Sequence, residues 1–429
     1  MTVSEAPDIQ EVYKSRTRIS SGTVGNLDNF QQQALKHLWI KIIAHFKATE
    51  DKPIDVTHSQ IKTDDFASAG ISGANSEAMD QWYNKNLERA SNVTTQTVRD
   101  KMYLEGIREI AVPGTFKPLF SGNKSSRLFA NAFWHACMLY SNPDSYLLMF
   151  LRATSWDVDA AFGKIVKSVE WRASQAIDEL MWNGELGQHY KMHSDGVTFR
   201  VGKDKLGYPV TIVRIKLNIA RERSENVVEK YAAFALEQTA LIARDFGERA
   251  TLVYDFSGFK RENIDMAFIK VLLSIISESY PQMFSLTVHF VNSWLFTGIW
   301  KVVRSWLDPQ VAKRTVIAKD TDQLETYIDN DQILVDMGGK LSYSYKYVFP
   351  TKAENAKMFD TEGRINAETQ LKATVDAFFA ATKEWTASSD TSSNYMDPAR
   401  VQAAAAFHKA ALELDPYIRA RFLTERVAK

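Results

Sequence analysis

Residues 250–318 decide the fold, and they read ATLVYDFSGFKRENIDMAFIKVLLSIISESYPQMFSLTVHFVNSWLFTGIWKVVRSWLDPQVAKRTVIA. Thr251 to Phe256 is rich in β-branched and aromatic residues and stops at Ser257-Gly258, which predicts a buried strand that ends in a turn. From Asn263 to Ser279 apolar residues recur at helical spacing. We expect this helix to end before Tyr280-Pro281, because proline disfavours α geometry in the preceding residue.

A tryptophan-rich segment, Trp294 to Leu307, lies between two further predicted strands at 286–292 and 314–318. Its only charged residues are Lys301 and Arg304. An ordinary surface helix buries a stripe of about 100°, so we expect this helix to hide apolar surface on two sides. Two arrangements would do so. The helix is either sandwiched in the core, or it is a mobile lid that covers an apolar cavity with one face and meets lipid with the other.

The composition narrows the class of protein. The chain has 429 residues with 52 basic and 52 acidic side chains, so it can bury a large core and has no global basic field for nucleic acid. Cys137 is the only cysteine, which excludes an intrachain disulfide. No stretch reaches the roughly 20 apolar residues of a membrane span, and the acidic N-terminus does not resemble a signal peptide. We therefore expect a cytoplasmic protein.

Four short motifs follow one another along the chain, and they are Asp255-Phe256-Ser257-Gly258, Tyr280-Pro281, Leu307-Asp308-Pro309 and Gly338-Gly339-Lys340. In this order and spacing they resemble the CRAL-TRIO lipid-transfer family. This resemblance favours the mobile lid over a helix sandwiched in the core. Upstream, Tyr146 to Val158 is similar to that family's Leu-x-x-Phe-Leu-Arg-Ala-Arg motif. The chain resembles most the fungal phosphatidylinositol/phosphatidylcholine transfer proteins, over about 22–47 and 145–429.

The resemblance implies an α/β fold with two lobes and a C-terminal helical extension. One lobe is helical, and the other has a mixed β-sheet as the floor of a hydrophobic cavity that a gate helix closes. The expected parts are a disordered N-terminus at 1–21, the helical lobe at 22–182 with a polar insertion at about 48–92, the lipid-binding domain at 183–342 and the extension at 343–429.

The expected cavity follows from strand geometry together with the resemblance. Strands alternate their faces, so Ala250, Leu252 and Tyr254 point to one side of the sheet, and in the family this side lines the cavity. The expected cavity residues are Ala250, Leu252, Tyr254, Ala267, Val271 and His289. The expected gate residues are Trp294, Phe296, Ile299, Trp300, Val303 and Trp306, with hinges at Gly298, Gly338 and Gly339.

The headgroup positions depart from the family's pattern. Members that bind phosphatidylinositol have a second arginine in Arg-Ala-Arg, a Glu-Arg pair after Tyr-Pro and a lysine after Leu-Asp-Pro. The corresponding residues here are Thr154, Gln282, Met283 and Arg314, with Arg152 and Lys313 nearby. One or two cationic side chains bind a phosphate only weakly. We therefore expect a weakly polar lipid, such as a sterol precursor, a squalene-like isoprenoid or an acyl ligand, with phosphatidylinositol as the alternative.

Other functions were weighed against this one. Asp255 ends a strand as a catalytic acid might, but in the family it belongs to a turn, so we expect no enzyme. Tyr254 and His289 could offer axial ligands to haem, as in some fungal relatives. A mid-strand residue such as His289 is most often a core histidine with its hydrogen bonds satisfied. His189 and His193 have the i, i+4 spacing of a metal pair, but no third ligand is near in sequence.

The expected partners are a lipid ligand and, transiently, a membrane surface. We expect no nucleic acid partner, no metal and no cofactor other than the bound lipid, and a monomeric chain. A scaffold whose cavity is filled by side chains is the remaining class. It would tolerate bulky residues at Ala250, Ala267 and Gly298.

Overall fold

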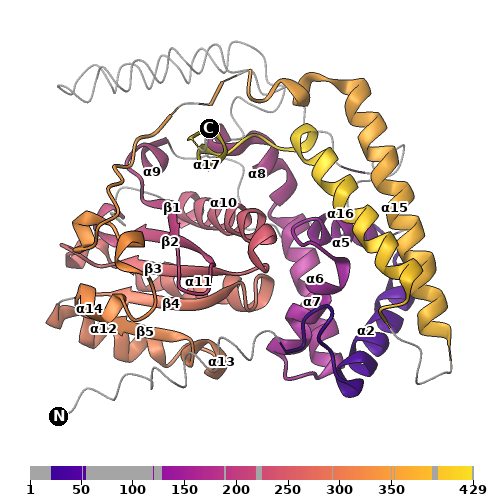
Figure 1. The fold of residues 1–429 in the computed structure, drawn as a ribbon, viewed down its shortest axis with the longest axis horizontal. Helices are drawn as coiled ribbons and strands as arrows, with labels where there is room; N and C mark the ends of the chain where they lie inside the picture. Colours follow the sequence, from indigo (N-terminus) through magenta and orange to yellow (C-terminus); the bar gives the residue numbers. More distant parts are fainter. Residues whose placement is uncertain are drawn as a thin grey trace.

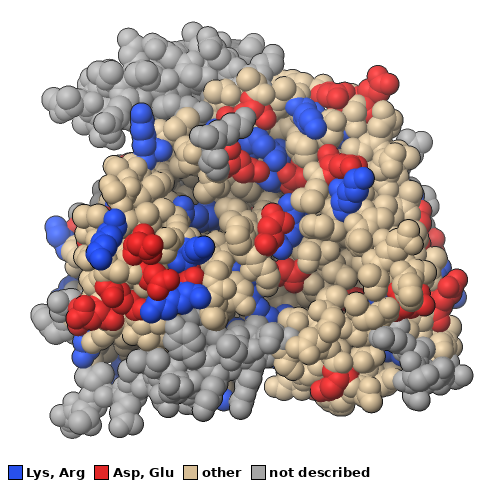
Figure 2. All heavy atoms as spheres, in the orientation of Figure 1, with Lys and Arg blue, Asp and Glu red and all other residues tan. Residues whose placement is uncertain are grey.

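The structure is a computed structural model, and it describes residues 21–50, 52–54, 119, 128–187, 190–218, 225–291, 293–348, 350–351, 353–388 and 395–427. Almost all of the N-terminal segment expected to be disordered and most of the polar insertion lie outside these ranges. Figure 1 shows a sheet with its flanking helices beside a bundle of helices, which is the expected mixed α/β fold. On the face seen in Figure 2, basic and acidic side chains are interspersed.

Five strands form one mixed sheet in the order β1-β2-β3-β4-β5. They are β1 (Thr198–Lys203), β2 (Pro209–Arg214), β3 (Ala250–Asp255), β4 (Phe284–Phe290) and β5 (Thr315–Ala318). β1 and β2 are antiparallel, and the later neighbours are parallel. Parallel neighbours need crossover connections, which are α10 (Glu225–Ala243), α11 (Met266–Ser279) and α12 (Trp294–Arg304). The predicted strands are therefore present, with ends shifted by one or two residues.

Local sequence sets the ends of α11 and α12. The Asp265 carboxylate accepts a hydrogen bond from the Phe268 backbone N–H at 2.9 Å, so α11 begins later than predicted. It ends at Ser279, before Tyr280-Pro281, as expected. α12 ends at Arg304, and a turn leads to the short helix α13 (Pro309–Ala312).

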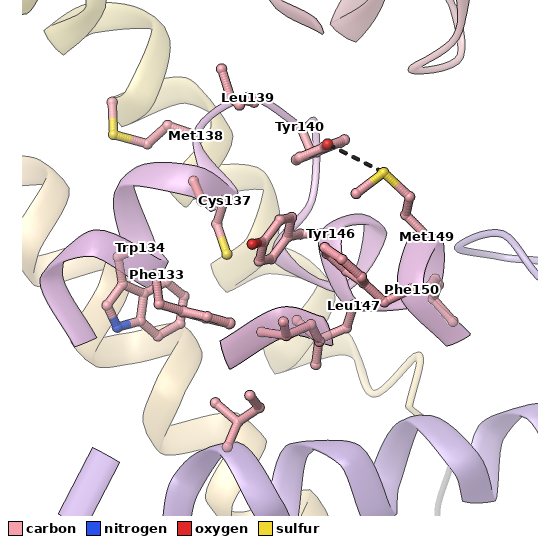
Figure 3. Packing of buried hydrophobic residues seen from close by; sticks show 14 of the residues in the cluster. Phe133, Trp134, Cys137, Met138, Leu139, Tyr140, Tyr146, Leu147, Met149 and Phe150 are labelled. Atoms are coloured by element: carbon pink, nitrogen blue, oxygen red, sulfur yellow. Dashed lines mark hydrogen bonds between the residues drawn. The ribbon is translucent and has the colours of Figure 1, made fainter. Parts of the chain in front are cut away.

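The helical lobe packs around aromatic side chains. Its helices are α2 (Asn29–Ala48), α5 (Phe129–Cys137), α6 (Pro143–Ala153) and α7 (Val158–Ser174). Asp28 begins α2 with a capping box that includes Gln31. Figure 3 shows Phe133, Trp134 and Tyr146 packed together, with the Tyr140 hydroxyl donating to the Met149 Sδ at 3.4 Å. Burial raises the pKa of the Cys137 thiol well above its usual value, so this cysteine is an unreactive core residue.

The C-terminal helices share the core of the helical lobe. α15 (Thr361–Ala387) and α16 (Pro398–Ile418) pack on each other, and α15 also packs against α2 (Figure 1). The Arg400 guanidinium donates two hydrogen bonds of 2.6 Å to the Asp144 carboxylate of α6. The Trp39 indole donates to the same carboxylate at 2.7 Å. A buried ion pair therefore fixes the C-terminal helices on the lobe.

The remaining elements are short, and they are the α-helices α8 (Ile177–Asn183), α9 (Tyr190–Ser194), α14 (Thr321–Leu324) and α17 (Leu423–Val427), with 3-10 turns at Gly184–Gly187, Ile215–Leu217, Arg244–Phe246, Arg261–Asn263, Asn330–Gln332, Val335–Met337 and Ala356–Phe359. None of the described helices is long and apolar enough to cross a membrane.

Candidate ligand cavity

A cavity of about 210 Å³ lies between one face of the sheet and the helices α10, α11 and α12. On the strands every second residue faces it, as the pleat requires. The strand residues that line it are Thr198, Thr211, Val213, Leu252, Tyr254, Phe284, Thr287, His289 and Thr315. The helix residues that line it include Val228, Ala232, Ala235, Leu236, Phe268, Ile269, Leu272, Leu273, Ile276, Phe296, Ile299, Trp300 and Val303. The wall is therefore mostly apolar, with hydroxyl groups on the sheet side.

Three expected cavity residues do not line the cavity. Ala250 is fully buried but packs in the core shared with the helical lobe. Ala267 is exposed and Val271 is 36% exposed, because they lie on the outer face of α11. The inner face of the same helix presents Phe268 and Leu272, one position further along. The expectation was wrong for Ala267 and Val271 because the helix is apolar on both faces, so its spacing alone does not identify the inner one.

α12 covers the cavity with one face only. Phe296 is 4% and Val303 is 8% exposed, and both line the cavity together with the half-buried Ile299 and Trp300. On the outer face Gly298 and Lys301 are exposed, and Val302 and Trp306 are 44% and 36% exposed. The alternative in which this helix is sandwiched in the core is therefore wrong. Apolar side chains on the outer face are what the lid arrangement requires, and the movement of the lid stays a prediction. The side chain of Trp294 is not among those that the structure describes.

The expected hinge glycines lie apart from one another. Gly298 has no atoms within 4 Å of where a Cβ would stand. Gly338, with a φ of +89°, and Gly339 form a tight turn in which a Cβ would collide with Thr321 and with the Ile333 backbone. The adjacent Leu334 and Met337 pack on the face of the sheet away from the cavity. A hinge role for these glycines stays a prediction.

Tyr254 and His289 place two polar rings on the sheet side of the cavity. They are opposite each other on β3 and β4, and their rings stack with centroids 5.3 Å apart at 12°. The rings of Phe256, Phe296 and Trp300 also surround the imidazole, at 4.8 to 5.8 Å. Burial lowers the pKa of His289 to about 3 and raises the pKa of Tyr254, so both side chains are neutral at physiological pH.

The His289 imidazole departs from the expected core histidine. Its Nδ1 is buried and has no hydrogen-bond partner among the described residues. Four aromatic rings surround the imidazole, and the haem alternative stays a prediction. His193 is buried against Tyr231 and Phe234, and His189 lies outside the described residues. Within the described part of the chain, no group of three metal-ligating side chains occurs.

Replacing His289 with phenylalanine should reduce the loss of stability in acid. The folded-state pKa is lowered, so the unfolded chain binds the proton first and stability falls as the pH drops from about 6.5 towards 3. The slope is at most about 1.4 kcal/mol per pH unit for one histidine. Melting temperatures at pH 7 and pH 5 should therefore differ less for His289→Phe than for the wild type. Equal differences would show that His289 is not buried in the neutral form.

The expected headgroup residues divide into two groups. The Thr154 hydroxyl donates to the Phe150 carbonyl at 3.0 Å at the end of α6, and Lys313 is exposed. Neither lines the cavity, and Met283 is buried in the core. Gln282 and Arg314 do line the cavity. The Arg152 Nε donates to the Gln282 side-chain oxygen at 3.0 Å, so the second group meets at the turn before β4.

Arg249 joins this group, and the sequence analysis missed it. Its Nη1 donates to the Gln282 carbonyl at 3.2 Å, and the residue is 4% exposed. β3 and β4 are parallel neighbours in which Ala250 pairs with Phe284, so the residues before the two strands must meet. Strand pairing could have indicated this contact. Three arginines, and not the one or two cations expected, therefore lie at this end of the cavity.

Comparison with known proteins gives the family. Residues 193–339 match the CRAL/TRIO domain. A relative in Eremothecium gossypii, "Phosphatidylinositol transfer protein CSR1", is 30% identical over 291 residues, which cover 65% of this chain and 66% of the relative. A CRAL-TRIO domain-containing protein of Schizosaccharomyces pombe is 29% identical over 303 residues, or 69% of this chain and 67% of the relative.

The crystal structure of Sfh5 aligns with a TM-score of 0.35 at 16% identity, over 41% of this chain and 64% of that one. This likeness is too weak to bear on function. The two sequence alignments span about two thirds of the relatives' own length. The matched range includes all five strands, α10 to α13 and the motifs from Asp255 to Gly339. The chain is therefore a CRAL-TRIO protein.

Proposed function

We propose that the chain holds one lipid in the cavity beneath α12 and exchanges it with membranes. The observation that supports this is the apolar wall formed by the sheet, α10 and α11, with α12 as its cover. Each methylene moved from water into such a wall contributes about 0.8 kcal/mol, so the cavity can replace the bilayer as an environment for hydrocarbon chains. A relative of similar sequence is itself named a phosphatidylinositol transfer protein.

The proposed transfer involves no covalent chemistry. Tyr254 and His289 are the titratable side chains on the cavity floor, and burial keeps both neutral. We further propose that the chain acts as a cytoplasmic monomer and meets membranes transiently through the outer face of α12. That face offers Val302 and Trp306 as exposed apolar side chains beside Lys301.

The weakly polar ligand expected from the sequence rested on a count of cations at the family's motif positions. Arg249 was not in that count, and it lies at the same end of the cavity as Arg314. We therefore still propose a lipid ligand, but the number of cations no longer argues against a charged headgroup. Phosphatidylinositol remains a candidate ligand on equal terms.

Organic extraction of the purified chain, followed by mass spectrometry, tests the proposal. We expect a co-purified lipid at up to one molecule per chain, and uptake of labelled lipid from vesicles by the emptied protein. Absence of both would contradict lipid binding and favour a scaffold. A Soret absorption band in the purified protein would instead support the haem alternative, and would mean that the rings around His289 move apart.

A further inference from the structure

Two polar side chains of the ligand cavity lack hydrogen-bond partners among the described residues. His289 is 8% exposed, and its buried Nδ1 has no partner there. Burial alone lowers the pKa of His289 and raises that of Tyr254, and no hydrogen bond or charged group contributes to either shift. Buried polar groups in folded proteins are nearly always hydrogen-bonded, because leaving one unpaired costs stability. Tyr254 and His289, here called the polar pair, therefore need a partner that the neighbouring side chains do not supply.

The side chains around the polar pair are aromatic. The ring centroids of Phe256, Phe296 and Trp300 lie 4.8 to 5.8 Å from that of His289. The two phenylalanine rings carry no hydrogen-bonding group, and the Trp300 indole makes no hydrogen bond to the His289 Nδ1. Both members of the pair line the cavity. A partner can therefore come from the molecule that fills the cavity.

The polar pair lies far from the arginine end of the cavity. Arg314 directly precedes β5 and donates to the carbonyl of Phe284, the first residue of β4. His289 is five residues further along β4, which at about 3.3 Å per residue places it roughly 17 Å from Phe284. One polar group of a ligand cannot reach both ends. The polar pair therefore meets a different part of the ligand, beneath Phe296 and Trp300 of α12.

The chemistry of the two rings indicates which group they can bind. Both are neutral at physiological pH, so neither attracts a charged group. A neutral imidazole has one nitrogen that accepts a hydrogen bond and one N–H that donates, and the phenol O–H can do either. A ligand hydroxyl also donates and accepts, so it can bond to both rings at once. A carbonyl oxygen only accepts, and a hydrocarbon leaves both rings unpaired.

We propose that Tyr254 and His289 bind a hydroxyl group on the enclosed part of the lipid and so determine which lipids the cavity selects. This inference rests on the proposed function. A site built to hydrogen-bond a hydroxyl rejects an analogue that lacks it, because the polar groups of the site are then left unpaired. The selected ligands would be uncharged and hydroxylated where they lie over β3 and β4, whatever group they carry at the arginine end.

Uptake of two probes that differ by one hydroxyl tests the inference. The emptied full chain is incubated with phosphatidylcholine vesicles that contain labelled octadecanol or labelled octadecane. The ratio of alcohol uptake to alkane uptake is compared between variants, because the preference of the vesicle for either probe then cancels. Tyr254→Phe and His289→Phe should each lower this ratio about tenfold, the effect of leaving one buried hydrogen-bonding group unpaired. Uptake of the alkane should not fall.

Tyr343→Phe is the matched control. Tyr343 packs against Phe199 on the face of the sheet away from the cavity, so the loss of its hydroxyl should leave the ratio unchanged. The melting temperature of the emptied protein gives a second measurement. Tyr254→Phe removes a hydroxyl without a partner, so this temperature should stay the same or rise. A clear fall would show that the Tyr254 hydroxyl bonds within the protein, and would overturn the proposal.

The remaining outcomes are distinct. An unchanged ratio in both folded variants would overturn the proposal. Equal loss of both probes would do the same, because it indicates a change in the shape of the cavity and not a lost hydrogen bond. So would a wild type that takes up the alkane but not the alcohol, or a Soret band that Tyr254→Phe abolishes. If the wild type takes up neither probe and carries no co-purified lipid, the proposed function itself fails.

Discussion

Replacing Ala235 with tryptophan should abolish most lipid uptake. Ala235 lies on α10 and lines the cavity, so the indole would occupy space within the cavity of about 210 Å³. If it displaces about four methylenes of the ligand, the loss is about 3 kcal/mol, or about 100-fold in affinity. Transfer of labelled lipid from vesicles to the protein measures the effect.

A matched control is available on the neighbouring helix. Ala267 on α11 is exposed and faces away from the cavity, so Ala267→Trp adds the same side chain without filling the space. Its uptake should equal that of the wild type. If Ala235→Trp binds lipid as well as Ala267→Trp does, the ligand does not occupy this cavity. Both variants should fold and unfold in a single thermal transition. The indole of Ala235→Trp enters a cavity and needs little repacking, and that of Ala267→Trp lies on the surface.

The choice between Ala235 and Ala267 shows what the sequence could not decide. The order of strands and helices followed from alternation, helical spacing and Tyr280-Pro281, all of which are local. Local sequence does not show which face of α11 points to the cavity, because Val271 and Leu272 are both apolar. Only the packing of the helix on the sheet places Leu272 on the inner face and Val271 on the outer face. For the same reason the apolar pattern of α12 left open whether the helix is sandwiched in the core or covers the cavity with one face, and the exposure of Val302 excludes the first arrangement.

Long-range pairing was the second limit. The headgroup positions were read from motif alignment, which contains no information about residues outside the motifs. Arg249 reaches Gln282 only through the parallel pairing of β3 and β4. The ion pair between Asp144 and Arg400 joins residues 256 apart in sequence, so no local pattern indicates it. The partners of such buried charges can be identified only when the fold is known.

Replacing Glu237 with glutamine should destabilise the whole chain by about 3–5 kcal/mol, the usual cost of removing one partner of a buried ion pair. The Glu237 carboxylate of α10 accepts two hydrogen bonds from Arg172 of α7, at 2.5 and 3.0 Å. It accepts a third from the Tyr280 hydroxyl at 2.5 Å. The Arg172 and Glu237 side chains are 5% and 2% exposed, so the substitution leaves a buried cation without its anion. Urea unfolding measures the loss.

Asp376→Asn provides the matched control, since it makes the same change from carboxylate to amide in an ion pair on the surface. Asp376 and Lys372 are 3.0 Å apart and both side chains are 63% exposed, so the expected loss is below about 1 kcal/mol. A loss of the same size for Glu237→Gln would show that the buried pair is not needed for stability.

The position of Glu237 also predicts how the chain unfolds. The Glu237–Arg172 pair joins α7 of the helical lobe to α10, which forms part of the cavity wall. Tyr280, which also donates to Glu237, directly follows the helix α11 of the same wall. If this contact couples the lobes, the wild type should unfold in one transition. Glu237→Gln should then separate the unfolding of the two lobes, and a lipid bound in the cavity should stabilise only the transition of the sheet lobe. A single transition in the variant would mean that the shared core around Leu252 and Tyr280 is sufficient to couple them.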